Sequence, residues 1–86
     1  MAEYQVTFSR SASQELRRLD PPVARRILAA IEKLAIDPRP PGCMKLTGSQ
    51  NEWRIRIGDW RVIYIIDDGK LIADIAAIRH RSDAYR

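Results

Sequence analysis

The chain has 86 residues, enough for one domain that folds alone, although a domain of this size removes only roughly 60% of its unfolded surface from water. Its 15 Lys and Arg outnumber its 11 Asp and Glu, which gives a formal charge of +4 and an isoelectric point near 9.7. This excess points to a nucleic acid or an acidic protein as partner, while solvated surface charge is the alternative for any single arginine.

The scarcity of cysteine and histidine excludes two common ways of stabilising a small fold. Cys43 cannot form an internal disulfide, and Cys43 with His80 is too small a set for a zinc site. We therefore expect no metal, no cofactor and a reducing, cytoplasmic location. The polar start and the lack of a long apolar run predict neither an export signal nor a membrane span. We expect a single domain over residues 1–86.

A strand and a helix are predicted in the first 20 residues. Tyr4–Phe8 alternates apolar and polar residues with period two, which indicates a strand. Ser9 is a favourable N-cap for a helix that should end near Leu19. The apolar face of this helix is formed by Ala12, Leu16 and Leu19.

A second helix is predicted to begin at Asp20, an N-cap residue followed by two prolines that suit the first turn. Its buried stripe is formed by Ile27, Ile31 and Leu34. The basic residues of both helices lie on the other faces, where they form either a solvated surface or a track for an RNA backbone. These residues are Arg17, Arg18, Arg25, Arg26 and Lys33.

The second half of the chain predicts a sheet. The prolines of residues 37–42 cannot continue a helix, so this segment is a stiff connector. After a short turn or strand at residues 45–48, strands are expected at 53–57, 61–67 and 71–79, and Asp67–Lys70 is expected to form a tight turn in which Asp-Gly supplies positive backbone angles. The predicted class is α+β, with the order β-α-α-β-β-β and a helical hairpin packed on a small, mainly antiparallel twisted sheet.

Alternation along residues 53–57 predicts a cationic sheet face. Trp53, Ile55 and Ile57 should enter the core, so Arg54 and Arg56 project together from the other side. Gly58-Asp59 should form a hairpin turn, and Arg61 would then join the pair across the hairpin. Such a cluster suits phosphate. The alternatives are a charged face that discourages edge aggregation and, for Arg61, a pair with Asp59 or Asp74.

Three aromatic side chains near this hairpin could stack on bases, but alternation makes two of them core residues instead. Trp53 is expected in the core together with either Trp60 or Tyr64.

The order of elements and three segments resemble the RelE/ParE toxin superfamily, and its RelE branch in particular. The segments are Lys45-Leu46-Thr47-Gly48, the run from Trp53 to Tyr64, and the ending from Ile78 to Arg86. The resemblance implies a RelE-like, microbial-ribonuclease-like fold. It also implies the toxin of a type II toxin-antitoxin system, a metal-independent endoribonuclease that cleaves messenger RNA in the ribosomal A site.

The resemblance assigns roles to residues of the last two strands and the C-terminus. Arg61 matches the phosphate-binding arginine of the family, and Arg79 matches an arginine suggested as charge stabiliser or proton donor. Tyr85 matches the C-terminal tyrosine, which contacts base and ribose and is implicated in proton transfer. Lys45 and Arg81 are candidates for contacts with RNA.

Positions 54 and 56 depart from the family pattern. The best-known member has paired lysines there, whereas this chain has Arg54 and Arg56. Arginine, with a pKa above about 12, is a poor general base, although it can stabilise a phosphorane. The proton acceptor would then be Tyr85 or His80. If residues 79–81 are extended, however, Arg79 and Arg81 share one face and His80 points away.

The implied partners are a RelB-like antitoxin, the ribosome and messenger RNA, with operator DNA bound only through the antitoxin complex and no membrane partner. Two alternatives stay open. One is a ParE-like inhibitor of DNA gyrase, and the other is a catalytically inactive homologue that acts in operon repression with its antitoxin.

Overall fold

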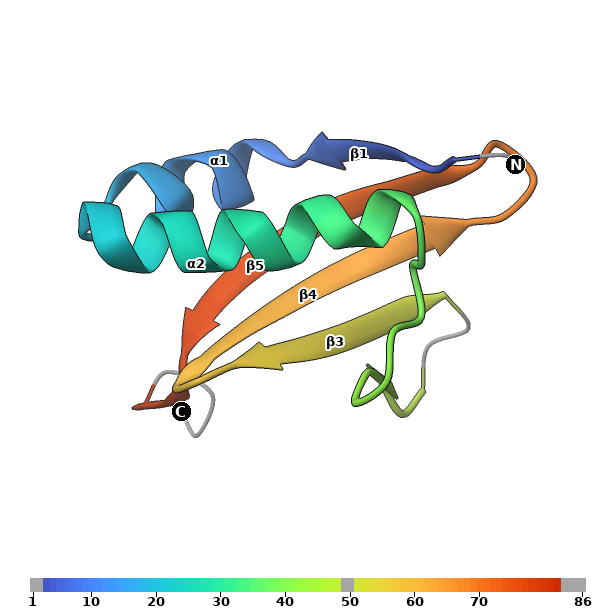
Figure 1. The fold of residues 1–86 in the computed structure, drawn as a ribbon. Helices are drawn as coiled ribbons and strands as arrows, with labels where there is room; N and C mark the ends of the chain where they lie inside the picture. Colours follow the sequence, from blue (N-terminus) through green and yellow to red (C-terminus); the bar gives the residue numbers. More distant parts are fainter. Residues whose placement is uncertain (1–2, 49–50, 83–86) are drawn as a thin grey trace.

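The computed structural model describes residues 3–48 and 51–82, in which two helices pack on one face of a five-stranded sheet (Figure 1). The strand order is β1-β5-β4-β3-β2; β1 runs parallel to β5, and the other neighbours are antiparallel. In chain order the elements are β1 (Gln5–Phe8), α1 (Arg10–Arg17), α2 (Pro21–Glu32), the 3₁₀ helix η1 (Lys33–Ala35), β2 (Met44–Lys45), β3 (Glu52–Ile57), β4 (Trp60–Asp67) and β5 (Ile72–His80). The predicted α+β class is confirmed.

The two helices begin where the sequence predicts. The Ser9 hydroxyl accepts a hydrogen bond of 3.0 Å from the backbone N–H of Ala12, as an N-cap does. Asp20 occupies the N-cap of α2 and proline follows at N1, but the Asp20 side chain makes no capping bond. Helix α1 ends at Arg17, two residues before the predicted end. Among the described residues, no helix has the length and apolar character that crossing a membrane requires.

The core lies between the helices and the sheet. Ile27, Ile31 and Leu34 of the helical layer are each 0% exposed, as their spacing predicts. Full burial of such a side chain contributes about 1.5–3 kcal/mol. The sheet residues packed against them are Ile55, Val62, Tyr64, Ile66, Ile75 and Ile78. The opposite face of the sheet carries charged side chains together with exposed apolar ones such as Met44 and Ile65.

A β-bulge changes the phase of side-chain alternation in β5. Ala76 has no opposite residue on β4, since the pairing register shifts by one at this point. An extra residue in one strand moves every following side chain to the other face. Ile75 and Ile78, three residues apart, therefore both enter the core, with exposures of 0% and 2%. The bulge also places Arg79 on the open face.

The β3–β4 and β4–β5 turns differ in which residue has a left-handed backbone conformation. Gly58, in the two-residue turn between β3 and β4, has φ +59°. In the turn between β4 and β5, the residue with positive φ is Leu71, at +56°, and not Gly69 as predicted. The reason is that this connection is longer than a tight two-residue turn: Asp67 accepts a hydrogen bond of 3.0 Å from the Lys70 N–H, and the chain reverses only at Leu71.

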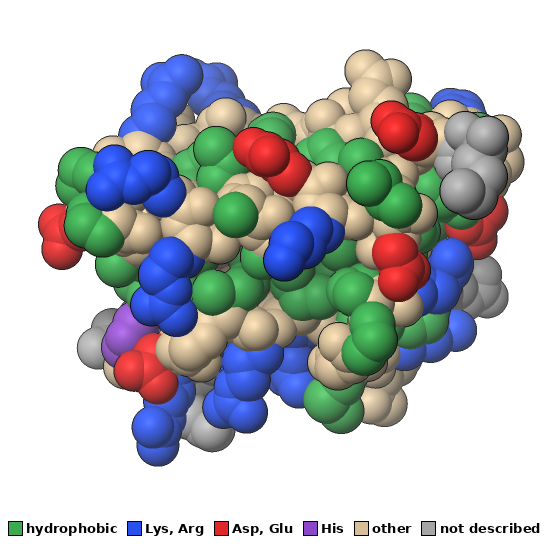
Figure 2. Space-filling model, in the orientation of Figure 1, with side chains coloured by type: hydrophobic (Ala, Val, Ile, Leu, Met, Phe, Trp, Pro, Cys, Tyr) green, Lys and Arg blue, Asp and Glu red, His purple; other side chains and the backbone are tan. Residues whose placement is uncertain are grey.

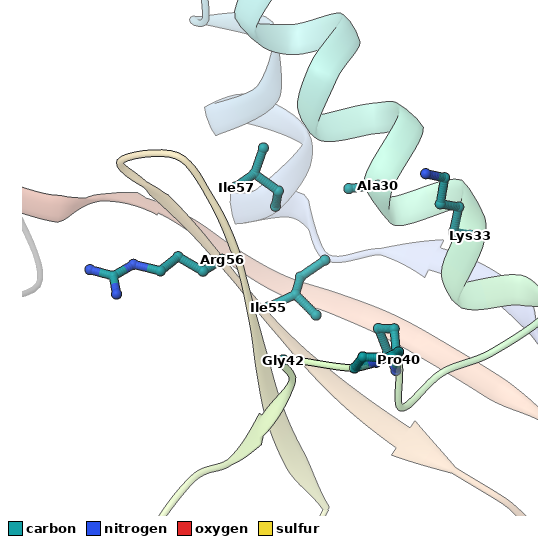
Figure 3. Close-up of a pocket in the computed structure, with 8 residues that line it drawn as sticks. Ala30, Lys33, Pro40, Gly42, Ile55, Arg56 and Ile57 are labelled. Atoms are coloured by element: carbon teal, nitrogen blue, oxygen red, sulfur yellow. The ribbon is translucent and has the colours of Figure 1, made fainter.

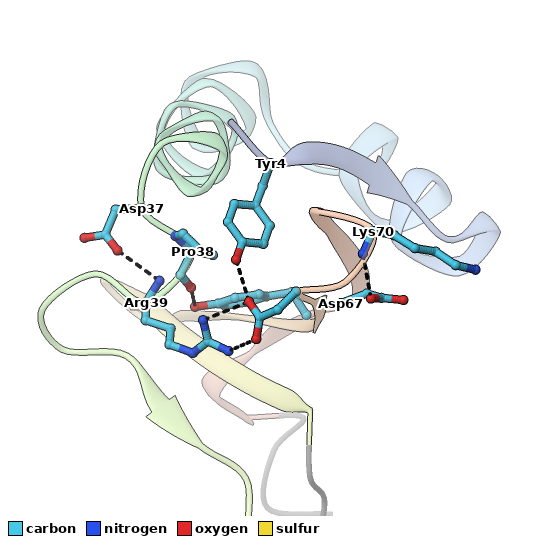
Figure 4. Close-up of polar contacts among 8 residues, drawn as sticks. Tyr4, Asp37, Pro38, Arg39, Asp67 and Lys70 are labelled. Atoms are coloured by element: carbon cyan, nitrogen blue, oxygen red, sulfur yellow. Dashed lines mark hydrogen bonds and ion pairs between the residues drawn. The ribbon is translucent and has the colours of Figure 1, made fainter. Parts of the chain in front are cut away.

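The proline-rich connector is held to the sheet by hydrogen bonds (Figure 4). The hydroxyl of Tyr64 donates to the carbonyl oxygen of Pro38 at 2.7 Å, and both residues are buried. Burial is the main reason why the pKa of Tyr64 is raised. The bond satisfies a buried carbonyl that the connector itself cannot pair.

Asp68 joins three distant parts of the chain, and we call Tyr4, Arg39 and Asp68 the clasp. The Arg39 guanidinium donates to both carboxylate oxygens, at 3.2 and 2.9 Å, and the Tyr4 hydroxyl donates to the same carboxylate (Figure 4). These bonds lower the pKa of Asp68, with the Arg39 bond as the largest cause. The clasp thus ties the N-terminus and the connector to the β4–β5 turn.

Candidate functional site

Three arginines form a row across three adjacent strands on the open face of the sheet. Arg56 of β3 lies directly opposite Arg61 of β4, and Arg61 lies directly opposite Arg79 of β5. Directly opposite residues of an antiparallel pair have Cβ atoms about 4.5–5.5 Å apart and point to the same face. We call Arg56, Arg61 and Arg79 the arginine row. The structure therefore places three of the predicted site residues side by side.

Arg54 extends this cationic face along β3. It lies two residues before Arg56, hence on the same face, and its neighbours across the strands are Met44 of β2 and Ile63 of β4. Its guanidinium lies 3.1 Å from the Sδ of Met44. Met44 is 56% exposed, so apolar surface lies next to the cations. This combination suits a ligand with phosphates and unpaired bases better than a simple inorganic anion.

The arginine row brings three groups of like charge together on adjacent strands. Like charges directly opposite one another on a sheet destabilise it, so this arrangement costs folding free energy. An anion bound across the row would remove that repulsion, and planar guanidinium groups match phosphate oxygens in two-bond geometry. By contrast, Figure 2 shows the basic side chains scattered over the face that carries α2. The concentration of charge on the open face is what distinguishes it as a site.

Arg79 has an acidic partner that the sequence did not indicate. Glu15 of α1 forms an ion pair with the Arg79 guanidinium, and its other carboxylate oxygen accepts a hydrogen bond of 3.1 Å from the Ile78 N–H. No sequence motif signals this contact, because the two residues lie 64 positions apart and meet only through the packing of α1 on β5.

His80 lies on the opposite face of the sheet from the arginine row. It follows Arg79 in β5, so its side chain points to the helical side, where its ring meets that of Trp60 edge-on with centroids 4.9 Å apart. Its Nδ1 lies 3.0 Å from the Ser82 hydroxyl. Trp53, Trp60 and Tyr64 all lie on this helical side too, which is one more than the prediction of two core aromatics.

The other predicted site residues lie around the row or outside the described part of the chain. Lys45 is exposed and pairs with Trp53 across β2 and β3, so its side chain alternates away from the face that carries Arg54. Arg81 is exposed and follows the end of β5 at His80; its N–H donates to the Asp59 carbonyl at 2.7 Å. Tyr85 falls outside the described residues.

A hollow of about 410 Å³ lies between α2, the connector and β3. Figure 3 shows that Ile55 and Ile57 point toward it from β3; Arg56 also lines it, but its guanidinium extends away on the other side of the strand. Its other lining residues are Ala30, Lys33, Pro40, Pro41 and Gly42. The hollow is mainly apolar and lies mostly behind the strand from the arginine row, with Arg56 as the residue common to both.

The fold and the cationic sheet face define a small, basic α+β protein with its charge concentrated on the open face of the sheet. The family described as ParE toxin of type II toxin-antitoxin system, parDE, matches residues 6–85. The chain therefore belongs to the RelE/ParE toxin superfamily, as the resemblance of its sequence predicts. A comparison with curated proteins gives no match.

Solved structures place the fold with RelE proteins. A chain of the archaeal RelE-RelB complex from Pyrococcus horikoshii superposes with a TM-score of 0.82 at 28% identity, covering 94% of this chain and 97% of that one. A chain of the toxin-antitoxin complex RelBE2 from Mycobacterium tuberculosis gives 0.81 at 25% identity, with 92% and 99% covered. The intact E. coli RelBE complex gives 0.80 at 22% identity, with 90% and 95% covered, which shows the same fold.

Proposed function

We propose that this protein is a ribosome-dependent endoribonuclease that cleaves messenger RNA in the A site and so inhibits translation. The observation that supports this most strongly is the arginine row: Arg56, Arg61 and Arg79 are direct neighbours across three strands. A row of guanidinium groups can hold the scissile phosphate and its neighbours. The likeness to chains of RelE-RelB complexes is consistent with this role.

The chemistry that this face can support is attack by the ribose 2′-hydroxyl on the adjacent phosphate. The reaction needs a base for the hydroxyl proton, cations around the phosphate oxygens, and an acid for the leaving 5′-oxygen. The three arginines of the row, with Arg54, supply the cations. Removal of one such donor typically costs about 10²–10³-fold in rate. The mechanism needs no metal ion in the step that breaks the chain.

Proton transfer falls to a residue other than the arginines, because a guanidinium stays protonated at cellular pH. His80 is the less suitable candidate, since it lies against Trp60 on the other face of the sheet. We therefore assign proton transfer to Tyr85, which lies outside the described residues. We expect Tyr85→Phe to bind ribosomes normally and to cleave messenger at a strongly reduced rate, as measured by single-turnover assays.

The proposed inhibitor of this activity is a RelB-like antitoxin. Matched chains come from complexes of RelE with RelB, which supports a partner of that kind. An antitoxin with an acidic segment would neutralise the arginine row, and an amphipathic helix would cover apolar surface. Operator DNA would be bound through the antitoxin in the joint complex.

The test is to map messenger cleavage on programmed ribosomes and to repeat it with a messenger that carries a single 2′-deoxyribose at the mapped nucleotide. We expect cleavage in the A site with a 2′,3′-cyclic phosphate end, and no cleavage at the deoxy position. Intact natural messenger would refute the ribonuclease assignment, and cleavage at the deoxy position would refute the 2′-hydroxyl mechanism.

A second candidate is inhibition of DNA gyrase, which is favoured by one observation: the matching family is described as ParE toxin. The same preparation should therefore be added to gyrase and supercoiled DNA. Double-strand breaks or loss of supercoiling, together with intact messenger on the ribosome, would assign the protein to this activity.

A further inference from the structure

Glu15 fills a gap at the edge of the sheet. Strand β1 pairs with β5 only from Ile72 to Ile75, and the chain then leaves the sheet to enter α1. Ser9 donates the next two bonds of this edge: its N–H to the Ile75 carbonyl at 2.9 Å and its hydroxyl to the Ala76 carbonyl at 2.9 Å. The N–H of Ile78, further along the same edge, donates to Glu15.

The carboxylate of Glu15 is shared between two donors that lie side by side. One oxygen accepts from the Ile78 N–H at 3.1 Å, and the other accepts from the guanidinium of Arg79. The Glu15 side chain is 21% exposed and that of Arg79 is 45% exposed. The backbone bond fixes the carboxylate, and the fixed carboxylate in turn restrains the guanidinium, leaving its remaining N–H groups for another acceptor.

Only an acid meets both requirements at position 15. A carboxylate has two acceptor oxygens, whereas a carboxamide has one acceptor oxygen and one donor group. With glutamine, either the Ile78 N–H or the Arg79 guanidinium would face another donor. Arg79 is also the end of the arginine row, next to Arg61, and would be repelled from it without a counter-charge.

We propose that Glu15 is a positioning residue that holds the Arg79 guanidinium beside Arg61 so that the two bind the same RNA phosphate. This role rests on the proposed ribonuclease function. Glu15 does not touch the substrate; it acts through Arg79. Its negative charge also lowers the affinity of the face for RNA. Glu15 thus improves the placement of the Arg79 guanidinium but weakens the electrostatic attraction of RNA.

The test compares the wild type, Glu15→Gln, Glu15→Asp and the control Glu32→Gln in single-turnover cleavage on programmed ribosomes. Glu32 is an exposed acid at the end of α2, so its substitution changes the net charge by the same amount. We expect Glu15→Gln to lower the cleavage rate at saturation by about tenfold or more, because small misplacement of a catalytic group can cost about 10²-fold. The half-saturating concentration should stay the same or fall, since a negative charge has been removed.

Two further results would support the proposal. Glu15→Asp keeps both acceptor oxygens and should recover part of the rate, and Glu32→Gln should stay within about twofold of the wild type, as expected for a surface change. The shape of the pH–rate profile should be unchanged in Glu15→Gln. A wild-type rate in Glu15→Gln would overturn the proposal, and so would loss of one limb of the pH profile, which would make Glu15 the proton acceptor instead.

A readout without RNA separates this proposal from the proposed function. The Nη1–H signal of Arg79, which donates to Glu15, is observed by NMR in the free protein; it should be protected from exchange in the wild type and lose that protection in Glu15→Gln but not in Glu32→Gln. If the wild type cuts no messenger and the signal behaves as expected, the ribonuclease function fails while the restraint on Arg79 stands. An unprotected Arg79 signal in the wild type would refute the restraint itself.

Discussion

Arg54 and Arg56 carry guanidinium groups, which present several N–H donors in a plane but keep their charge at cellular pH. On the open face of the sheet they can bind phosphate oxygens and cannot accept a proton. The roles in the proposed site follow from this: the sheet arginines bind phosphate, and another residue must transfer protons. Lysine at the same positions would allow one group to do both, because the pKa of lysine shifts readily on burial.

Binding of RNA should weaken with salt in proportion to the number of arginines in contact. Four phosphate contacts to a single strand predict a log–log slope of roughly −3, and each substitution Arg56→Gln, Arg61→Gln or Arg79→Gln should reduce its magnitude by about 0.7. The measurement is titration of a short RNA with 2′-O-methyl groups, which cannot be cut, over a range of salt concentrations. Arg25→Gln, on the exposed side of α2, is the control and should leave the slope unchanged. A flat salt response of the wild type would contradict phosphate binding by the row.

The hydrogen bond from Tyr64 to Pro38 should contribute measurably to stability. Tyr64→Phe leaves the buried Pro38 carbonyl without its donor, so the free energy of unfolding should fall by about 1–2 kcal/mol. For a domain of this size, each kcal/mol corresponds to roughly 4–8 °C in Tm. Tyr4→Phe removes a hydroxyl of the clasp, which is closer to solvent, and should cost less. Equal losses in the two variants, measured by thermal unfolding, would argue against a special role for the buried bond.

Arg54, Arg56 and Arg61 could be predicted because strand alternation and the hairpin turn are local properties of the sequence, whereas Arg79 is predicted only from the family resemblance. Trp53, Ile55 and Ile57 are apolar, so Arg54 and Arg56 had to face the other way, and the structure places them there. Glu15 could not be predicted in the same way. Its role depends on where α1 lies relative to the edge of β5, which no local pattern encodes.

At the level of strands, the bulge at Ala76 shows why the sequence of β5 does not predict which of its side chains face the core. A regular strand would put Ile75 and Arg79 on the same face, since they are four residues apart. The extra residue separates them, and both can then occupy suitable environments. The run of small residues at Ala76 and Ala77 is compatible with a bulge but does not demand one.

The β4–β5 turn is a second element whose conformation the local sequence does not predict. Asp-Gly at positions 68 and 69 is the usual signal for a tight turn, but the connection continues to Leu71, which carries the positive φ. Asp68, inside this turn, is held by Arg39 and Tyr4, from parts of the chain that are distant in sequence, so its setting is not determined by the local sequence alone.

The clasp should make stability depend on pH in the acid range. Because the pKa of Asp68 is lower in the folded protein than in the unfolded chain, its ionised form stabilises the fold above its ordinary pKa, and this contribution is lost as the pH falls through the folded pKa. Asp68→Asn should therefore be less stable than the wild type above about pH 5, and the difference should shrink below about pH 4. Urea unfolding at several pH values measures it. Asp20→Asn, at an N-cap without a side-chain bond, is the control. A difference that does not change with pH would contradict the ion pair.

In the molecule as a whole, one face of the sheet packs the core and the other carries the proposed anion-binding site. The helices and the apolar side chains of β3, β4 and β5 form the core on one side, and the arginine row occupies the other. A chain of 86 residues has a small core. The cationic face does not add to its stability, because neighbouring like charges on a sheet repel one another. The clasp and the hydrogen bond from Tyr64 to Pro38 hold the connector against the sheet. The arginine row is therefore not needed to hold the connector in place.

The most direct test of the arginine row is the rate of messenger cleavage on programmed ribosomes under single-turnover conditions, with Arg61→Ala compared with Arg25→Ala. Arg61 is the central member of the row, between Arg56 and Arg79, whereas Arg25 lies on the exposed side of α2. We expect Arg61→Ala to lower the rate by about 10²-fold or more and Arg25→Ala to stay within about twofold of the wild type. A wild-type rate in Arg61→Ala, with both variants folded, would contradict the claim that the row holds the scissile phosphate.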